Sequence, residues 1–360
     1  MLTGNRGEWS EIYVFLKLLA EGKLHAADAD LNADPNVYYP VIRIVRSGNG
    51  WTRHYCRNGD VVMNDGENGT TLKRVSVAEF LKQSTELLGV IERAKGSFPI
   101  PSIEAFLRTI DVSSLAASSL DKADIKITVH DQRTNKNPEL GFSIKSMLGK
   151  NSTLFNAGQT TNFVYEIVGD STASLDLEKI NAIVDEPMIA SRLEFIRSVG
   201  CKLEFDRVES TTLQSNLRLI DGDLPRILAD LLKLKYSSFS PLGLPELTSM
   251  LASLNPLAFD LSQGHPMYEH KVKNFLTDSA LGMTPSKVWC GSYSATGGMI
   301  IVKQDGEVVC YHIYNRREFQ EYLFRNSKLE QASTSRYGFG TLYRDAGKVF
   351  IKLNLQVRFK

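Results

Sequence analysis

Residues 121–150 read DKADIKITVHDQRTNKNPELGFSIKSMLGK, and this stretch decides the fold that we expect. In residues 124–130 apolar and polar side chains alternate strictly, and residues 140–145 alternate in the same way. The apolar positions are Ile125, Ile127, Val129, Leu140, Phe142 and Ile144. The connection at residues 131–138 holds two Asn and a Pro, which are typical of turns. The pattern therefore predicts a β-hairpin.

At the open end of this hairpin, the expected pairing brings a carboxylate and an ammonium close together. A pairing that places His130 opposite Glu139 also places Asp124 opposite Lys145 on the polar face. A carboxylate can hold a hard divalent cation, and an ammonium can stabilise a phosphorane or orient the attacking water. These groups suit metal-dependent phosphodiester hydrolysis. The alternative is a surface ion pair, which contributes about 0–1 kcal/mol.

The spacing of Asp124 and Ser143-Ile144-Lys145 resembles the PD-(D/E)XK nuclease motif, with Ser143 where the second acid usually stands. Three segments, which span nearly the whole chain in order, resemble the HpaII family of type II restriction endonucleases. They are GEWSEIYVFLKLLAEGKLHAADADL, LGFSIKSMLGKNSTLFNAGQTTNFVYEI and SRYGFGTLYRDAGKVFIKLNLQVRF. The resemblance implies an Mg²⁺-dependent enzyme that cuts double-stranded DNA at a short palindrome, CCGG. Such a target implies a homodimer or two sequential nicks.

The second acid of the metal site is open, because a serine hydroxyl is a poor Mg²⁺ ligand. Apolar spacing in residues 8–21 predicts an amphipathic helix, and some PD-(D/E)XK folds carry an auxiliary acid on such a helix. Glu11 is the first candidate, with Glu8 beside it. Carboxylates in a first helical turn are also explained by the helix dipole alone. Glu166, which follows the hairpin, is the rival.

Polar uncharged residues crowd the segment NSTLFNAGQTTNF, residues 151–163, directly after the hairpin. Beside a nuclease site such side chains can bind phosphates and base edges. A surface loop that caps a helix at about residues 160–168 explains them equally well without DNA. The candidate DNA-binding residues here are Lys150, Asn156, Gln159, Thr160 and Asn162.

The segment SRYGFGTLYRD carries Arg336 and Tyr337 next to glycines, which let a backbone approach a ligand closely. An Arg on such a loop suits bidentate contact with O6 and N7 of guanine. An ion-paired loop arginine is the alternative. The net charge of the chain is only +1, but residues 311–360 hold ten bases against four acids. Local positive charge of this kind is what phosphate binding requires.

The order of elements predicts an α/β, mixed α+β, fold in which helices flank a central mixed sheet, and the resemblance implies that this is a restriction-endonuclease-like core. We expect a catalytic core at residues 1–170, a helical insertion at 171–287, and a β-rich region at 288–360 that packs on the core and contacts DNA. Helices are expected at residues 8–21, 76–95, 102–110, 160–168, 175–200, 223–235 and 316–326. Strands are expected at 39–46, 51–56, 201–208 and 348–359, with a hairpin turn at Asp305-Gly306.

The cysteines and the apolar runs of the sequence limit which other classes of protein come into question. The four cysteines are far apart and form no C-x-x-C, so we expect reduced thiols rather than zinc ligands. No apolar run is long enough for a membrane span and residues 1–11 hold no apolar signal core, so we expect a cytoplasmic protein. Two alternatives stay open: a repair or mismatch-type nuclease with the same core, and a DNA-binding protein whose nuclease site is degenerate at Ser143.

Overall fold

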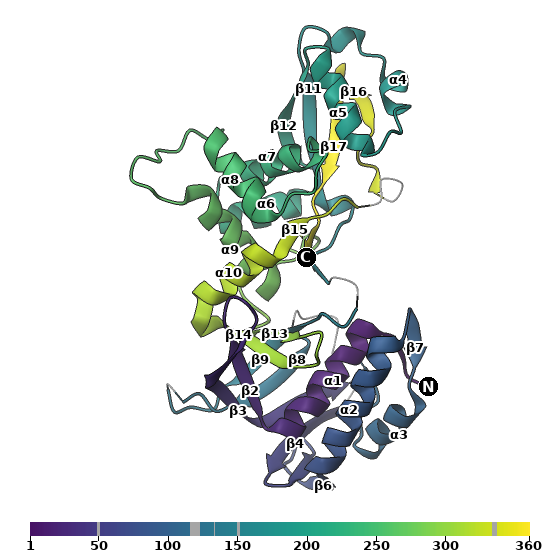
Figure 1. Ribbon diagram of the computed structural model, residues 1–360, viewed down its shortest axis with the longest axis vertical. Coiled ribbons are helices and arrows are strands. Elements are labelled where there is room, and N and C mark those ends of the chain that lie inside the picture. Colours follow the sequence, from purple (N-terminus) through teal and green to yellow (C-terminus); the bar gives the residue numbers. More distant parts are fainter. Residues whose placement is uncertain (49–50, 116–122, 133, 150–151, 333–336) are drawn as a thin grey trace. The chain divides into compact units, whose positions relative to one another are not determined.

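The chain forms two compact units in the computed structural model, which describes residues 1–48, 51–115, 123–132, 134–149, 152–332 and 337–360 (Figure 1). The first unit comprises Met1–Ser152, Ala280–Gly282 and Tyr293–Tyr322. The second comprises Thr153–Ser279, Met283–Ser292 and Leu323–Lys360. Each unit therefore combines distant segments of the chain, and this division differs from the three consecutive regions expected from the sequence.

Within the described residues, the first unit is built on a nine-stranded sheet. Its order is β2 (Lys23–Ala27), β14 (Val308–His312), β13 (Gly298–Val302), β9 (Glu139–Ser146), β8 (Ile125–Val129), β3 (Ala33–Gly48), β4 (Trp51–Asn58), β5 (Val61–Asp65) and β6 (Thr71–Ser76). β13 runs parallel to β9 and β14 parallel to β2, whereas the other neighbours are antiparallel. The predicted mixed sheet is confirmed, and so is the β13–β14 hairpin that turns at Asp305-Gly306.

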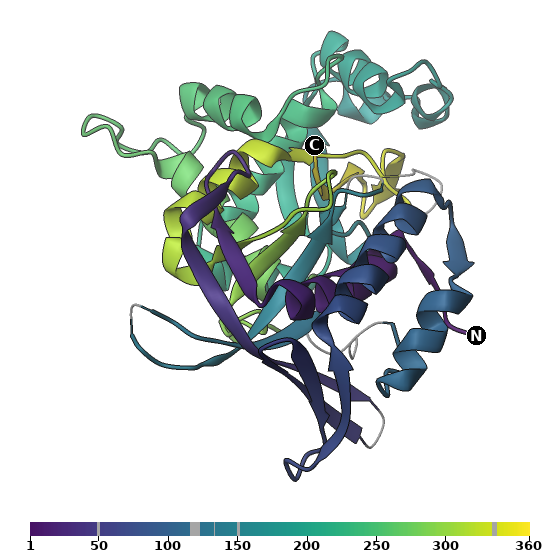
Figure 2. The same ribbon diagram turned by 60° about the horizontal axis from the view of Figure 1, so that its bottom comes forward.

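Helices α1 (Arg6–Glu21), α2 (Val77–Arg93) and α3 (Pro101–Thr109) confirm three of the predicted helices. Figure 2 shows α1 and α2 side by side along one face of the sheet. α1 is buried from Trp9 to Ala20 except at Glu11 and Lys17, because the sheet covers one side of it and α2 another. Burial of so many apolar side chains fixes α1 against the strands that carry the candidate site.

The hairpin of β8 and β9 forms as predicted, but its register differs by two residues. Thr128, not His130, lies opposite Glu139. His130 instead donates its backbone N–H to the carbonyl of Pro40 on β3, at 2.9 Å. The longer connection and the third strand therefore set the register, and neither is visible in the alternation of the hairpin itself.

The observed register, continued by one residue, sets Asp124 opposite Ser143 rather than Lys145. The expected pairing of Asp124 with Lys145 is therefore wrong. A shift of two residues leaves each side chain on its predicted face, because side chains alternate with a period of two. Asp124, Ser143 and Lys145 still share one face of the hairpin.

The second unit holds two smaller sheets. One has the order β12 (Lys202–Val208), β11 (Asn162–Val168), β17 (Lys348–Asn354) and β16 (Leu342–Asp345), and the other β10 (Thr153–Phe155), β18 (Val357–Phe359) and β15 (Ser327–Leu329). Its helices are α4 (Leu177–Asn181), α5 (Met188–Ser198), α6 (Thr211–Ile220), α7 (Leu224–Tyr236), α8 (Leu244–Leu254) and most of α9 (Met267–Leu281). Helix α10 (Arg316–Asn326) belongs to the first unit up to Tyr322 and to the second from Leu323. None of the described helices is long and apolar enough to cross a membrane.

Two predictions in this unit are wrong. The helix expected at residues 160–168 is a 3₁₀ turn, Gln159–Thr161, followed by strand β11. The sequence NFVYEIV is rich in β-branched and aromatic residues, its two edges pair with β12 and β17, and residues 162–165 and 167 are buried. The single strand expected at residues 348–359 is interrupted, and its two parts, β17 and β18, belong to different sheets.

Candidate active site

Asp124 stands immediately before β8, and its carboxylate lies against β9. Its backbone N–H donates to the carbonyl of Phe142 at 2.8 Å. Its Oδ2 accepts from the backbone N–H of Ile144 at 2.6 Å and from the hydroxyl of Ser143 at 3.3 Å. These charge-assisted hydrogen bonds fix the orientation of the carboxylate. Within the described residues no hydrogen bond reaches Oδ1, so this oxygen can bind a ligand.

Ser143 is buried, with 2% of its surface exposed. Its hydroxyl donates to Asp124, as a neutral side chain can, whereas a carboxylate at this position would repel the carboxylate of Asp124. Ser143 therefore supports the first acid and does not replace the second one.

Lys145 is half-buried on β9, two residues beyond Ser143, and projects from the same face. In the parallel pairing of β9 with β13, Lys145 lies opposite Ile301, whose side chain is buried. Among the residues that the structure describes, Lys145 forms no ion pair, so the surface ion pair with Asp124 that the sequence left open is absent. An ammonium on the same face as an oriented carboxylate, with no ion pair to any described residue, suits a phosphate oxygen.

Arg6 and Ser10 of α1 anchor the chain just beyond Lys145, and the sequence reasoning missed them. Arg6 donates from Nη1 to the carbonyl of Leu148 at 2.5 Å. The hydroxyl of Ser10 lies 2.8 Å from that of Ser146. These contacts hold the end of β9 against the helix at Ser146 and Leu148, the first and third residues after Lys145. Only the packing of α1 on β9 creates them, and no motif around Arg6 signals it.

Glu11 lies in the second turn of α1, because the helix begins at Arg6, so the dipole explanation applies only to Glu8. Glu11 is half-buried and acts electrostatically on Arg46 of β3, the strand next to β8. Burial lowers the pKa of the Arg46 guanidinium, and the neighbouring Tyr55 and Glu11 oppose that shift. Arg46 lies on the face of β3 that α1 covers, whereas Asp124, Ser143 and Lys145 project from the other face of the sheet. The part of Glu11 in a metal site therefore stays a prediction. No group of three or more His, Cys, Asp or Glu side chains that could hold a metal occurs among the described residues.

The two rival acids have structural partners. Glu8 accepts the backbone N–H of Asn5 at 2.8 Å and completes the capping box of α1. Glu166 lies on β11 in the second unit, where its carboxylate pairs with Lys348 at 2.8 Å. Both carboxylates therefore have a role in the fold itself.

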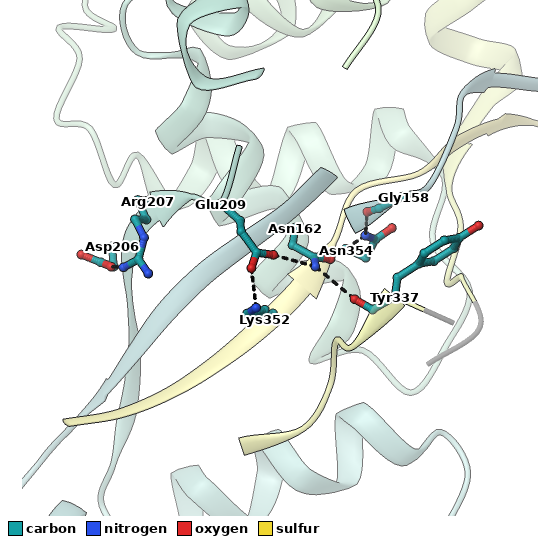
Figure 3. A network of polar contacts seen from close by, with 8 residues as sticks. All are labelled: Gly158, Asn162, Asp206, Arg207, Glu209, Tyr337, Lys352 and Asn354. Carbon is teal, nitrogen blue, oxygen red and sulfur yellow. Dashed lines mark hydrogen bonds and ion pairs between the residues drawn. The ribbon is translucent and has the colours of Figure 1, made fainter. Parts of the chain in front are cut away.

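Asn162 is the centre of a polar network in the second unit (Figure 3). Its Nδ2 donates to Glu209 Oε2 at 2.8 Å and to the carbonyl of Tyr337 at 3.1 Å. Its Oδ1 accepts from Asn354 at 2.6 Å, and Asn354 also donates to the carbonyl of Gly158 at 2.8 Å. Only 1% of Asn162 is exposed. Its amide is therefore occupied in tying β11 to β17 and to the Tyr337 backbone, which corrects the expectation that it offers polar groups at the surface.

The other residues expected to bind DNA lie differently. Asn156 and Gln159 are exposed and Thr160 is half-buried, so their side chains are accessible. Figure 3 shows the ring of Tyr337 pointing away from the network while its carbonyl is held within it. Lys150 and Arg336 fall outside the described residues.

Comparisons with known proteins identify the family to which this chain belongs. A family model described as HpaII restriction endonuclease matches residues 5–359. The chain is 43% identical over 363 residues to a protein from Haemophilus parainfluenzae named type II restriction enzyme HpaII, with 99% of this chain and 98% of that protein covered. No solved structure matches the chain. The chain therefore belongs to the HpaII family of type II restriction endonucleases, and it is a site-specific endonuclease.

Proposed function

We propose that this enzyme makes Mg²⁺-dependent double-strand cuts in DNA at CCGG, with Asp124, Lys145 and Glu11 as its functional groups. The observation that carries the proposal is the Asp124 carboxylate, which is oriented through Oδ2 and has no hydrogen bond at Oδ1 within the described residues. Lys145 projects from the same face of the hairpin, two residues beyond Ser143. The family supports DNA as the substrate, and the resemblance to it implies the CCGG site and the magnesium ion.

The donor set fits magnesium, which binds through one or two carboxylates and otherwise keeps water and substrate oxygens as ligands. Asp124 would hold the ion through Oδ1, while Ile144 and Ser143 keep the carboxylate in place. When bound, Mg²⁺ supplies a Lewis acid at the scissile phosphate. Lys145 stabilises the negative charge that develops on that phosphate or orients the attacking water.

Glu11 is our candidate for the second carboxylate, because it is half-buried on the helix that Arg6 and Ser10 fasten to the end of β9. Glu11→Gln should greatly weaken Mg²⁺-dependent cleavage, whereas Glu166→Gln should cost only the pairing with Lys348. Cleavage rates over a Mg²⁺ titration distinguish the two. A harmless Glu11→Gln together with an inactive Glu166→Gln would transfer the role to Glu166.

For base recognition we propose Arg336 as the guanine reader, with Tyr337, Asn156, Gln159 and Thr160 as neighbouring polar contacts and Lys150 on a phosphate. The exposure of Asn156 and Gln159 supports this, as does the anchoring of the Tyr337 carbonyl by Asn162. Loss of one bidentate contact costs about 1–3 kcal/mol of discrimination. Arg336→Ala should therefore lower binding to CCGG much more than to a one-base variant, in Ca²⁺ at fixed salt. Equal losses on both duplexes would make Arg336 a phosphate contact.

One digest tests the function as a whole. Purified enzyme and Mg²⁺ act on a plasmid of known sequence, and run-off sequencing reads the ends. We expect discrete fragments that end at CCGG, none when the metal is chelated, and none when the inner cytosine is methylated. Discrete ends at another sequence would refute CCGG, a smear would indicate a repair-type nuclease, and no cleavage would indicate a degenerate site. Accumulation of nicked circles would favour sequential nicking over a homodimer.

A further inference from the structure

Over strands β8, β3, β4, β5 and β6, the sheet of the first unit has one face that α1 and α2 do not cover. On β3, β4, β5 and β8 the buried residues Ile44, Tyr55, Val62 and Ile127 face α1 and α2 and belong to one core. Figure 2 shows these helices along one side of the strands. Side chains at the alternate positions project to the opposite side, because strand side chains alternate between faces.

Those alternate positions line up in two rows across the strands. Residues directly opposite each other in paired strands share a face. One row consists of Lys126, Val45, His54 and Asp65. The other consists of Thr128, Arg43, Cys56, Met63 and Arg74. All of them are half-buried or exposed except Thr128.

The charge on this face is mainly positive and begins at the candidate active site. Lys126 follows Asp124 by two residues on β8, and Lys145 projects from the same face of β9. Among the described residues neither Lys126 nor Arg74 forms an ion pair, and both are exposed. Arg43 shares its charge with Glu139 at 3.1 Å but keeps a third of its side chain exposed.

We propose that this face, defined by the rows from Lys126 to Arg74, is a platform for the duplex that flanks the cut site, and that Lys126, Arg43 and Arg74 contact its phosphates. The proposal rests on the function proposed above and extends it beyond the scissile phosphate. The scissile phosphate has to bind at Asp124 and Lys145. Duplex DNA is the ligand that fits this face, because the positively charged side chains of Lys126, Arg43 and Arg74 extend outward from that point across the strands.

The dimensions of the sheet set the reach of the platform. Five strand spacings separate β9 from β6, which is about 24 Å, or about seven base pairs along a duplex. Successive strands rotate by about 20–25°, so the surface is curved and not flat. Lys126 therefore lies beside the cut site, whereas Arg74 marks the far edge and meets only DNA that extends several base pairs outward.

The first test is the salt dependence of binding in Ca²⁺, where cleavage does not interfere. Each lost phosphate contact should reduce the slope of log K against log salt by about 0.9. We expect this for Lys126→Ala. Lys82→Ala on α2 is the matched control, because Lys82 lies in the same unit, is 69% exposed and removes the same charge. Equal effects of the two substitutions, or none from Lys126→Ala, would overturn the platform.

The second test uses flank length. One duplex ends about three base pairs beyond the site on each side, and the other extends about ten base pairs further, which is beyond the seven-base-pair reach. Arg74→Ala should reduce the slope on the long duplex and leave the short one unchanged, whereas Lys126→Ala should reduce it on both. Unchanged slopes with an altered sedimentation coefficient would mean that this face packs against a second copy, which contradicts the proposal.

These measurements can refute the platform without refuting the proposed function, and the reverse also holds. The slopes report binding and are read on any duplex that the enzyme binds, whereas CCGG cutting is read by the plasmid digest. An enzyme that cuts CCGG with unchanged slopes in both variants keeps its function and loses the platform. An enzyme that cuts another sequence but shows both slope changes keeps the platform.

Discussion

Polar residues serve different ends in the β8–β9 hairpin and in the network around Asn162. In the network, buried groups satisfy one another: Asn162 and Asn354 bond directly, and Lys352 pairs with Glu209 (Figure 3). In the hairpin, within the described residues, Asp124 has no hydrogen bond at Oδ1 and Lys145 has no ion pair.

The physical reason for this difference is the cost of a buried polar group without a partner, which is about 1–3 kcal/mol. A fold therefore closes its internal networks and leaves incomplete ones only where water or a ligand can complete them. This difference shows that a polar residue does not have a catalytic or binding role merely because it follows a catalytic motif in the sequence. Asn162 and Lys145 were both singled out from the sequence, but only Lys145 retains a group that can act on a substrate.

The largest expected effect comes from replacing a lysine on a strand in each region, Lys145 on β9 and Lys352 on β17. Lys145→Ala should lower the single-turnover cleavage rate by about 100-fold or more, because a positive charge is lost where negative charge develops. Its urea denaturation midpoint should stay close to the wild-type value, since Lys145 has no ion pair among the described residues. Lys352→Ala is the control, because Lys352 pairs with Glu209. It should change stability rather than cleavage, and a folded Lys145→Ala enzyme with near wild-type rates would break the comparison.

Asp124→Asn tests the open oxygen of the hairpin. The substitution keeps an oxygen that can accept from the Ile144 N–H and removes the negative charge that Mg²⁺ requires. Cleavage in Mg²⁺ should be lost, and DNA binding should persist or tighten, because a negative charge near the phosphates is removed. Gel-shift titrations beside cleavage assays separate these effects. Lost binding with intact cleavage would refute the assignment.

Asn162→Leu tests the closed network. It leaves Glu209, Asn354 and the Tyr337 carbonyl without their shared partner, so the free energy of unfolding should fall by about 2–4 kcal/mol. Urea denaturation measures this change. Gln159→Ala is the control, since Gln159 is exposed and should change stability by about 0.5 kcal/mol or less. Similar stability losses for both would show that the network does not hold this region.

Ser143→Ala should have the smallest effect. The hydroxyl bond to Asp124 is long, at 3.3 Å, and the Ile144 N–H at 2.6 Å keeps the carboxylate in place. We expect a loss of about 1 kcal/mol, or roughly fivefold in the cleavage rate. The Mg²⁺ concentration for half-maximal cleavage should change little. An effect as severe as that of Asp124→Asn would give the hydroxyl a direct part in the chemistry.

The sequence by itself determined the features that depend on local periodicity. Alternation located β8 and β9 and the shared face of Asp124, Ser143 and Lys145. Helical spacing located α1, and the Asp305-Gly306 turn located the β13–β14 hairpin. Each of these depends on residues a few positions apart, so a short stretch of sequence contains the whole signal.

Only the tertiary structure decided the features that depend on distant partners. The register of the hairpin follows from the bond of His130 to Pro40, and the anchoring of β9 follows from Arg6 and Ser10. Residues 162–168 form a strand because β12 and β17 pair with them on both sides. Periodicity states which face a side chain occupies, but not which strand lies beside it, because that choice is made by packing energies summed over the folded chain.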